Sequence, residues 1–285
     1  KDCMQQHRGW VDDVTAQMVM DFISKRDQTR PFFVMCHFKS VHDPWDSRAP
    51  YDTCYQNQFI FEPGNLCDHY ENRGQASKRT MLKIESIDQK TFEHQTLQTT
   101  DTCRQREFVY QQYIKAFLRG ANTLDENVGK MLAFLKEQRL DENTIVIYSS
   151  DQGHFLGEHG FFSKRFMYEE SMQMPLIIRY PGRVKPGSKN NDLVANIDFA
   201  PTIIELAGFP IPKEMQGESL KPLLEGNTPD DWREAIYYQY WQHLLHRDVT
   251  AHYGIRTKTH KLIYFHGQPL GMTDYHAVEP EWELY

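Results

Sequence analysis

Apolar residues recur every three or four positions in three segments of the chain, and each segment is predicted to form a helix. The segments are residues 12–23, 107–135 and 198–208. In the second segment, Gly120 is the place where the helix is expected to break, because glycine weakens a helix interior. In the third, Asp198 comes just before a proline in the first turn and is the expected N-terminal cap.

Short apolar runs without polar alternation predict buried strands. They occupy residues 32–36, 144–148 and 176–180. Runs of this kind are typical of a parallel sheet whose two faces are both covered. Because the helix at 107–135 leads into the strand at 144–148, we expect a helix-to-strand unit of the parallel type. The sequence therefore predicts an α/β protein with a mostly parallel sheet flanked by helices.

The pattern changes beyond Gly226, where aromatic-rich segments with alternating polarity predict a small antiparallel sheet. These segments are residues 235–241, 253–257 and 261–265. We therefore expect residues 1–226 to belong to the α/β domain and residues 227–285 to form an incomplete C-terminal α+β subdomain. Residues 48–106 lack periodicity, which is typical of long loops that shape the entrance of a site.

Composition narrows the class of protein. The chain has 285 residues, of which 40% are hydrophobic and 25% charged, enough for a large buried core. A net charge of −7 argues against a nucleic-acid partner. No run approaches the ~18 apolar residues of a membrane span, and residues 1–7 lack the apolar region of a signal peptide. Nothing in the sequence indicates an oligomeric state.

Polar residues that are candidates for a functional site follow the predicted strand at 144–148. Asp151 and Gln152 come first, and a carboxylate beside an amide offers the oxygen ligands that Ca²⁺ or Mg²⁺ prefers over zinc. His154 follows, and Lys164 lies ten residues later, close enough for the loop to fold back to the same place. Because ligands of open α/β sheets bind at the carboxyl ends of strands, this loop is predicted to grip a charged oxyanion. An ordinary solvated loop is the alternative.

A second polar cluster follows the strand at 32–36 and contains His42-Asp43-Pro44. A histidine in such a position is more often a turn residue than a site residue. The acidic pair Asp12-Asp13 at the start of the first helix is predicted to cap it. A metal-binding dyad is the alternative for that pair, but the residues before it are too short and mixed for a core strand.

Several of these segments together resemble the signature of type I sulfatases of the alkaline-phosphatase superfamily, in the branch that acts on sulfated carbohydrates. The matching segments are Ser150-Asp151-Gln152-Gly153, Gly157-Glu158-His159-Gly160, the run from Lys164 to Ser171, and Met174-Pro175-Leu176-Ile177. The element at residues 198–208 is similar to a structural helix of that family. The resemblance covers nearly the whole chain, but only the later part of the family's catalytic domain and the start of its C-terminal subdomain.

The resemblance implies hydrolysis of a sulfate ester of a carbohydrate with one Ca²⁺ ion. Asp151 and Gln152 would be metal ligands, and the remaining ligands are expected in an N-terminal part of the family pattern. Lys164 and His42 would be catalytic: the lysine would contact the sulfate, and the histidine would contact the sulfate or protonate the leaving oxygen. The family also implies a periplasmic, secreted or lysosome-like location.

Four further histidines are expected to bind substrate. His154 and His159 lie in the loop that carries the metal ligands. His243 and His252 lie in a loop similar to one that carbohydrate sulfatases bring back to the substrate. Surface histidines in connecting loops are the alternative interpretation for each of the latter pair.

The chain departs from the family at the nucleophile. No cysteine has the C-x-P-x-R or C-x-A-x-R pattern that is converted to formylglycine, and Cys103, with Arg106 at the third following position, comes nearest. We favour a portion of an active sulfatase, inactive by itself, over a degenerate member that binds sulfated glycans without cleaving them. A phosphate or phosphonate hydrolase of the same superfamily is the other enzymatic alternative.

The cysteines have no spacing typical of structural zinc. Cys54 and Cys67 lie in one polar segment and would be able to pair in an exported protein. Because a chain of this size needs no disulfide framework, we expect free thiols.

Overall fold

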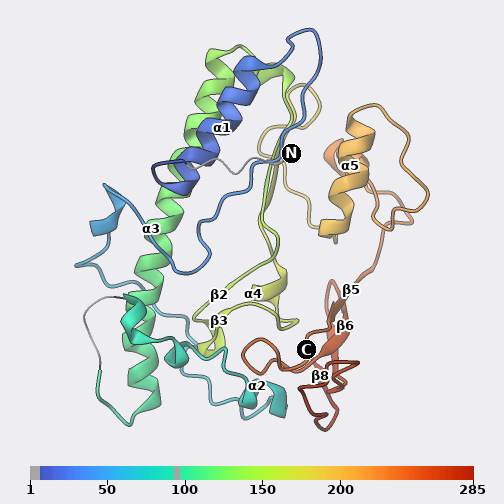
Figure 1. The fold of residues 1–285 in the computed structure, drawn as a ribbon. Helices are drawn as coiled ribbons and strands as arrows, with labels where there is room; N and C mark the ends of the chain where they lie inside the picture. The colour runs from blue at the N-terminus through green and yellow to red at the C-terminus, as the bar shows by residue number, and fades with distance from the viewer. Residues whose placement is uncertain (1–6, 93–96) are drawn as a thin grey trace. The chain divides into compact units, whose positions relative to one another are not determined.

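The computed structural model describes residues 7–92 and 97–285, in which the chain forms two compact units (Figure 1). The first unit contains Lys1–Leu66 and Ile87–Asn143, and the second contains Cys67–Ser86 and Thr144–Tyr285. The predicted division between residues 226 and 227 concerns a different boundary and stays a prediction.

Two helices that lie side by side form the framework of the first unit (Figure 1). They are α1 (Val11–Lys25) and α3 (Thr102–Glu137), and both confirm predicted helices. Helix α3 has 36 residues and continues through Gly120, so the predicted break is wrong. Gly120 is buried where Asp46 and Val41 approach the helix, and packing of this kind overrides a weak local propensity.

The acidic residues of α1 do not cap it, contrary to the prediction. Its N-cap residue, Trp10, makes no side-chain cap bond. Asp12 is fully buried and instead accepts hydrogen bonds from the backbone N–H groups of Lys39 (2.7 Å) and Ser40 (3.2 Å). Buried backbone donors need acceptors, and Asp12 supplies them to a distant loop. The metal-dyad alternative stays untested, although both Asp12 carboxylate oxygens already accept backbone protons.

The predicted strand at residues 32–36 does not form in the described part of the chain. Burial alternates along this segment, with Phe33 61% and Met35 62% exposed, as expected for an extended chain without a partner. A strand is defined by hydrogen bonds to a neighbour, and apolar composition cannot supply that neighbour. The unit also contains short 3-10 turns at Tyr51–Thr53, Gln89–Phe92 and Asp141–Asn143.

In the second unit, the two strands predicted at residues 144–148 and 176–180 form as β1 (Val146–Ser149) and β4 (Leu176–Arg179). The two strands are antiparallel, with Val146 opposite Arg179 and Ser149 opposite Leu176. The connection between them contains a small antiparallel hairpin, β2 (Phe155–Leu156) with β3 (Phe162–Ser163), and the short helix α4 (Glu169–Met172). Because this connection holds no long crossover helix, the chain returns antiparallel rather than in the parallel sense that we expected for β1.

A four-stranded antiparallel sheet confirms the C-terminal prediction. Its strands are β5 (Ala235–Tyr240), β6 (His252–Thr257), β7 (Lys261–Phe265) and β8 (Glu281–Leu284), paired in sequence order. The last strand was not predicted. The remaining elements of this unit are α2 (Gln75–Arg79), 3-10 turns at Ile84–Ser86, Glu158–Gly160 and Asn196–Asp198, α5 (Phe199–Leu206) and α6 (Lys221–Leu224).

Aromatic side chains build the core of the second unit. Phe161, Phe166 and Tyr168 from the segment between β2 and α4 stack on one another and pack against Phe265 of β7. The loop that follows β3 is therefore anchored by its own rings to the C-terminal sheet. This anchoring matters because Lys164 lies in that loop.

Asp198 precedes α5 as predicted, but its side chain does not cap that helix. Its buried carboxylate pairs with both terminal nitrogens of Arg233 and accepts backbone N–H bonds from Ala195 and Glu218. Thr202, one turn into α5, accepts a bond from the backbone N–H of Leu220. The element joins segments 18 to 35 residues apart, which is a structural role.

Candidate functional site

The loop after β1 presents Asp151 and Gln152. Asp151 is exposed, and its Oδ1 accepts bonds from the Gln152 backbone N–H (3.2 Å) and side-chain Nε2 (2.8 Å). The hydroxyl of Ser150 donates to the same oxygen (3.3 Å). Among residues 7–92 and 97–285, no donor is found for Asp151 Oδ2 or Gln152 Oε1. The loop thus holds one carboxylate oxygen and leaves a second carboxylate oxygen and an amide oxygen open.

These two open oxygens fit a hard cation. Carboxylate and amide oxygens are ligands of Ca²⁺ and Mg²⁺, whereas zinc prefers nitrogen and sulfur. Two ligands do not complete a calcium shell of 6–8 oxygens. Within the described residues, no cluster of three or more His, Cys, Asp or Glu side chains surrounds Asp151. The donor set therefore fits part of a metal site.

Ser171, in α4, connects the loop of Asp151 and Gln152, called here the metal-ligand loop after its predicted role, with the loop of Lys164, called here the lysine loop. Its carbonyl oxygen accepts the backbone N–H of Gly153 (2.9 Å), and its side-chain oxygen accepts the backbone N–H of Arg165 (2.8 Å). A Cβ atom on Gly153 would collide with the carbonyl oxygens of Glu170 and Gln173. Only glycine permits this approach. The loop therefore folds back as expected, so the residues next to Asp151 and Lys164 share one anchor.

Lys164 follows β3 in a loop of unusual backbone geometry. It is partly buried, and its neighbours Ser163 and Arg165 have φ angles of 68° and 104°. Non-glycine residues rarely adopt positive φ, and such strain is characteristic of functional segments. The conformation persists only where the surroundings hold it.

His159 is held in a network of charged side chains. Its Nδ1 lies 2.8 Å from Arg73 and 3.4 Å from Asp68, and its Nε2 lies 3.3 Å from Glu170. Since the guanidinium can only donate, Nδ1 is an acceptor and Nε2–H donates to Glu170. Burial raises the pKa of Glu170, but the bond from His159, a backbone N–H bond and the nearby charges of His159 and Lys261 together hold that pKa below its usual value.

His243 and His252 are both fully buried within the C-terminal sheet and its loops. His243 accepts the backbone N–H of Ala251 (3.2 Å) and lies 3.0 Å from the carbonyl of His276. This burial was not predictable from local pattern, because the aromatic rings around His252 come from distant segments. Substrate binding by His154, His159, His243 and His252 stays a prediction. The partly buried His154 lies nearest in sequence to the metal-ligand loop.

His42 belongs to the other compact unit, so its predicted convergence with Asp151 and Lys164 stays a prediction. Its side chain is 52% exposed, and Nδ1 lies 2.5 Å from the carboxylate of Asp43. Lys39 Nζ also lies 3.0 Å from Nδ1, but one nitrogen cannot both donate to Asp43 and accept from Lys39. The shorter carboxylate contact favours Nδ1–H, while Lys39 donates to the Asp43 carbonyl (2.6 Å). Nε2 is then the acceptor of the neutral ring.

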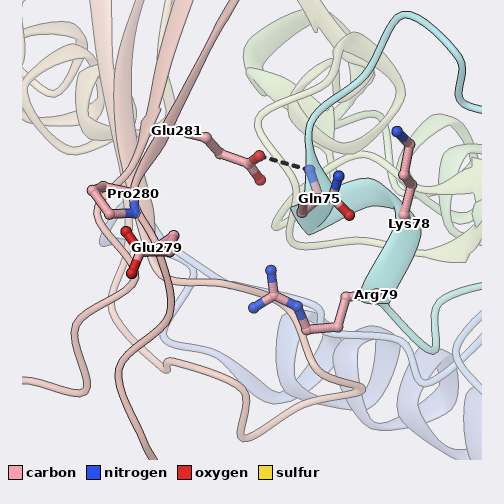
Figure 2. A pocket seen from close by; sticks show the side chains of 6 residues that line it. All are labelled: Gln75, Lys78, Arg79, Glu279, Pro280 and Glu281. Carbon is pink, nitrogen blue, oxygen red and sulfur yellow. Dashed lines mark hydrogen bonds between the residues drawn. The ribbon is translucent and has the colours of Figure 1, made fainter.

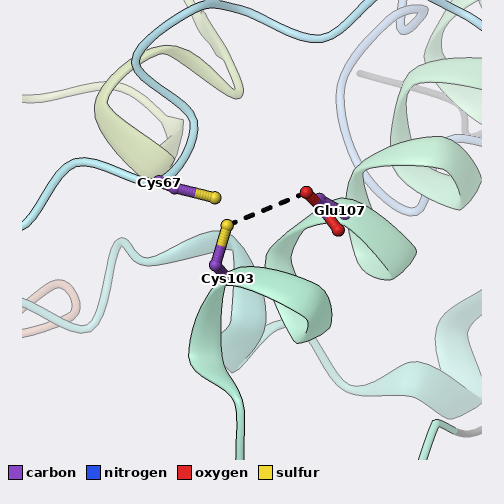
Figure 3. Close-up of side chains that lie close together, drawn as sticks. All are labelled: Cys67, Cys103 and Glu107. Carbon is purple, nitrogen blue, oxygen red and sulfur yellow. Dashed lines mark hydrogen bonds between the residues drawn. The ribbon is translucent and has the colours of Figure 1, made fainter.

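The oxidation state of two cysteines differs from the prediction. Cys67 and Cys103 are in disulfide form, whereas Cys36 and Cys54 are free. Figure 3 shows the side chain of Cys103 beside that of Glu107. Our expectation of free thiols is therefore wrong for Cys67 and Cys103, and the suggested Cys54–Cys67 pair does not form. Cys3 lies outside the described residues. Although Glu107 lies 3.8 Å from Cys103 Sγ, disulfide sulfurs are not thiolates, so this cluster is no metal site.

None of the predicted site residues lines a cavity of about 540 Å³ in the second unit. It is lined by Gln75, Lys78, Arg79, Glu279, Pro280 and Glu281 (Figure 2). The Glu281 carboxylate accepts the backbone N–H groups of Gln75 (2.6 Å) and Ala76 (2.5 Å), and Glu283 accepts that of Gly74 (2.9 Å). The carboxylates of β8 thus hold the first turn of α2. The polar groups on this side of the cavity are therefore already used in structural hydrogen bonds.

Comparison with solved structures defines the class. The chain superimposes with a TM-score of 0.89, at 34% identity, on a protein solved in complex with its substrate D-glucosamine-2-N,6-O-disulfate, covering 98% of this chain and 63% of that one. A phosphonate monoester hydrolase from Silicibacter pomeroyi matches with a TM-score of 0.71 at 22% identity, which shows the fold alone. The chain has the α/β fold of alkaline-phosphatase-like enzymes, with a C-terminal antiparallel sheet.

The sulfatase family model matches residues 4–209, and the model of the C-terminal part of N-sulphoglucosamine sulphohydrolase matches residues 157–283. The chain belongs to the sulfatase family. It is 37% identical to an N-acetylglucosamine-6-O-sulfatase of Bacteroides thetaiotaomicron and 29% identical to the human N-acetylglucosamine-6-sulfatase. These alignments cover 98% and 81% of the chain but only 56% and 39% of the two relatives.

The resemblance inferred from the motifs is confirmed, as is the match to a C-terminal portion. Members of this family use a metal ion. No helix in the described part of the chain is long and apolar enough to cross a membrane. Sequence reasoning missed Ser171 as a link between loops, although Gly153 was a usable signal: a glycine after two polar residues indicates close backbone approach.

Proposed function

We propose that this sulfatase removes the 6-O-sulfate from a glucosamine residue of a sulfated carbohydrate. The observation that carries the proposal is the pair of open oxygens on Asp151 and Gln152, tied through Ser171 to the loop of Lys164. The substrate class is supported by relatives described as acting on N-acetylglucosamine 6-sulfate and by the glucosamine disulfate bound in the solved relative.

The proposed metal is one Ca²⁺ ion, with Asp151 and Gln152 as two of its ligands. When bound, the ion polarises the sulfate oxygens and neutralises their charge. The Lys164 ammonium contacts a sulfate oxygen and offsets negative charge that develops as the S–O bond breaks. The attacking group is assigned to a formylglycine, which the family implies and for which the 285 residues hold no C-x-P-x-R or C-x-A-x-R motif.

His42 is proposed as the acid that protonates the leaving alkoxide. Asp43 accepts Nδ1–H and fixes the orientation of the ring, and Nε2 is the proposed site from which the proton passes to the leaving oxygen. In sum, the ester and water give the free sugar hydroxyl and hydrogen sulfate. Substrate binding remains the proposed role of His154, His159 and His243, whereas both ring nitrogens of the fully buried His252 are bound to the backbone of Thr250 and Met167.

An oxidising compartment, periplasmic, extracellular or lysosome-like, is also part of the proposal. The disulfide state of Cys67 and Cys103 supports it, because such bonds persist mainly in exported proteins.

The test is sulfate release from N-acetylglucosamine 6-sulfate by the complete protein, with a phosphonate monoester as the competing substrate. Release should stop with a chelator and return with calcium, and the 285-residue chain alone is the matched inactive control. Hydrolysis of the phosphonate without release of sulfate would replace this proposal with the hydrolase alternative. Binding of the sulfated sugar without turnover would indicate a glycan-binding protein.

A further inference from the structure

The backbone just after Lys164 is held by three side chains of the second unit, one from the nearby helix α4 and two from the C-terminal sheet. Ser171 Oγ accepts the N–H of Arg165 (2.8 Å), and the Tyr238 hydroxyl donates to the carbonyl oxygen of Arg165 (2.7 Å). His252 Nε2 accepts the N–H of Met167 (3.2 Å). Both polar groups of Arg165 are thus bound by side chains, at the residue whose φ is 104°.

The chemical state of two of these side chains is fixed by their surroundings. His252 lies among the rings of Phe166, Tyr238, Tyr240 and Phe265. Its Nδ1 lies 2.7 Å from the carbonyl of Thr250, so Nδ1–H donates there and Nε2 is left as the acceptor for Met167. Burial lowers the pKa of His252 to about 4, which keeps the ring neutral at pH 7.

The protonation state of Tyr238 is likewise set by burial. Burial raises the pKa of Tyr238 to about 12, so its hydroxyl remains a donor. The hydroxyl reaches across 73 positions in sequence to the lysine loop, so it acts as a tertiary brace. A positive φ angle is unfavourable for a non-glycine residue, and these bonds are suited to offset its cost.

We propose that Ser171, Tyr238 and His252 are positioning residues that hold the loop of Lys164 in its strained conformation and so aim the ammonium at the sulfate. This inference rests on the proposed function of Lys164. It gives His252 a task that a fully buried ring can perform, since the histidine acts on the backbone three residues from Lys164.

The test uses Tyr238→Phe in the complete enzyme, with Tyr237→Phe as the matched control. Tyr237 is the adjacent residue of β5, is 60% exposed, and donates its hydroxyl to Gln239 rather than to the loop. Losing one neutral hydrogen bond should lower kcat by about three- to tenfold with KM little changed, whereas the control should keep wild-type values. Equal kcat in the two variants would overturn the proposal.

A double-mutant cycle shows whether Tyr238 acts through Lys164. In a Lys164→Ala background, Tyr238→Phe should have no further effect on kcat, because the group that it positions is gone. An undiminished effect in that background would mean that Tyr238 acts elsewhere and would contradict the proposal.

Amide hydrogen exchange supplies a readout that does not depend on activity. Ser171→Ala should speed exchange at the Arg165 amide by about tenfold, and Ser171→Thr, which keeps the side-chain oxygen, should restore most of the protection. Unchanged exchange in Ser171→Ala would overturn the inference. If the wild-type enzyme releases no sulfate, the proposed function fails, while this measurement still decides whether the loop is held as described.

Discussion

Two aspartates from the same family signature have opposite environments. Asp198, before α5, is completely buried, and both of its carboxylate oxygens are taken by Arg233 and by backbone N–H groups. Asp151, after β1, is exposed and leaves one oxygen without a donor in the described chain. The resemblance to the family implies a structural role for the helix that follows Asp198 and a metal-binding role for Asp151, and the donors around the two carboxylates differ accordingly.

The difference shows how a fold distributes polar groups. A buried carboxylate must be fully paired within the protein, because an unpaired charge there is very costly. A ligand-binding carboxylate keeps part of its capacity unused until the ligand arrives. Counting the protein donors around each oxygen therefore separates the two roles, and the following four predictions test that separation.

The largest effect is expected for Asp198→Asn. The substitution leaves the Arg233 guanidinium, only 13% exposed, without its carboxylate, and such losses cost about 3–5 kcal/mol in the free energy of unfolding. Urea unfolding of the purified protein measures it. Asp231→Asn, at an exposed position, is the control. A loss no larger than that of the control would show that full pairing does not mark a structural aspartate.

Lys164→Ala should have nearly as large an effect, but on catalysis. Removing a charge that contacts the sulfate should lower kcat/KM of the complete enzyme by about 10²–10³, or roughly 2.7–4 kcal/mol, with the melting temperature nearly unchanged. Lys164→Arg should recover only part of the activity, because a planar fork differs from a point charge. Exposed Lys213→Ala is the control. More than about a third of wild-type activity in the alanine variant would exclude a catalytic role.

A smaller effect is expected from pH, through the buried His252. Burial lowers its folded-state pKa from 6.5 to about 4, so between these values the unfolded chain takes up a proton and the folded chain does not. Stability should therefore fall as the pH drops from 7 to 4, by roughly 3 kcal/mol from this group, and not further below pH 4. NMR titration of the His252 ring, with the urea-unfolded chain as reference, checks this. A ring that protonates above pH 6 in the folded state would refute it.

The smallest effect is expected for Asp151→Asn without calcium. The side chain is exposed, so the free energy of unfolding should change by less than about 0.5 kcal/mol. Calcium should raise the melting temperature of the complete wild-type protein, because a ligand stabilises the state that binds it, and this gain should be lost in the variant. Thermal scans with calcium and with a chelator measure both. Equal gains would remove Asp151 from the metal site.

Local pattern was sufficient where local structure decides the outcome. The apolar spacing predicted α1, α3 and α5, and the alternating aromatic segments predicted the sheet of β5, β6 and β7. The loop of Asp151 and Gln152 was selected as a candidate site because it follows a strand-like run. Each of these features depends on residues close together in the sequence.

Prediction failed where a distant partner decides the outcome. Residues 32–36 have the composition of a strand, but a strand also needs a neighbour. The acidic start of α1 looks like a cap, yet Asp12 binds backbone 27 and 28 positions away. In the same way, His252 resembles a surface histidine until the rings that bury it are assembled from other segments. Sequence pattern carries no direct record of such partners.

The hydrogen bonds between β8 and the start of α2 determine when this part of the protein can fold during synthesis. Glu281 and Glu283 hold the backbone of residues 74–76 from about 206 positions further along the chain. During synthesis, those amide groups leave the ribosome long before their acceptors exist. We therefore expect the segment around α2 to remain unsettled in the nascent chain and to be fixed only when the last strand of the sheet emerges. A nascent chain stalled before residue 281 would lack the acceptors for these amide groups, so we expect it to bind chaperones.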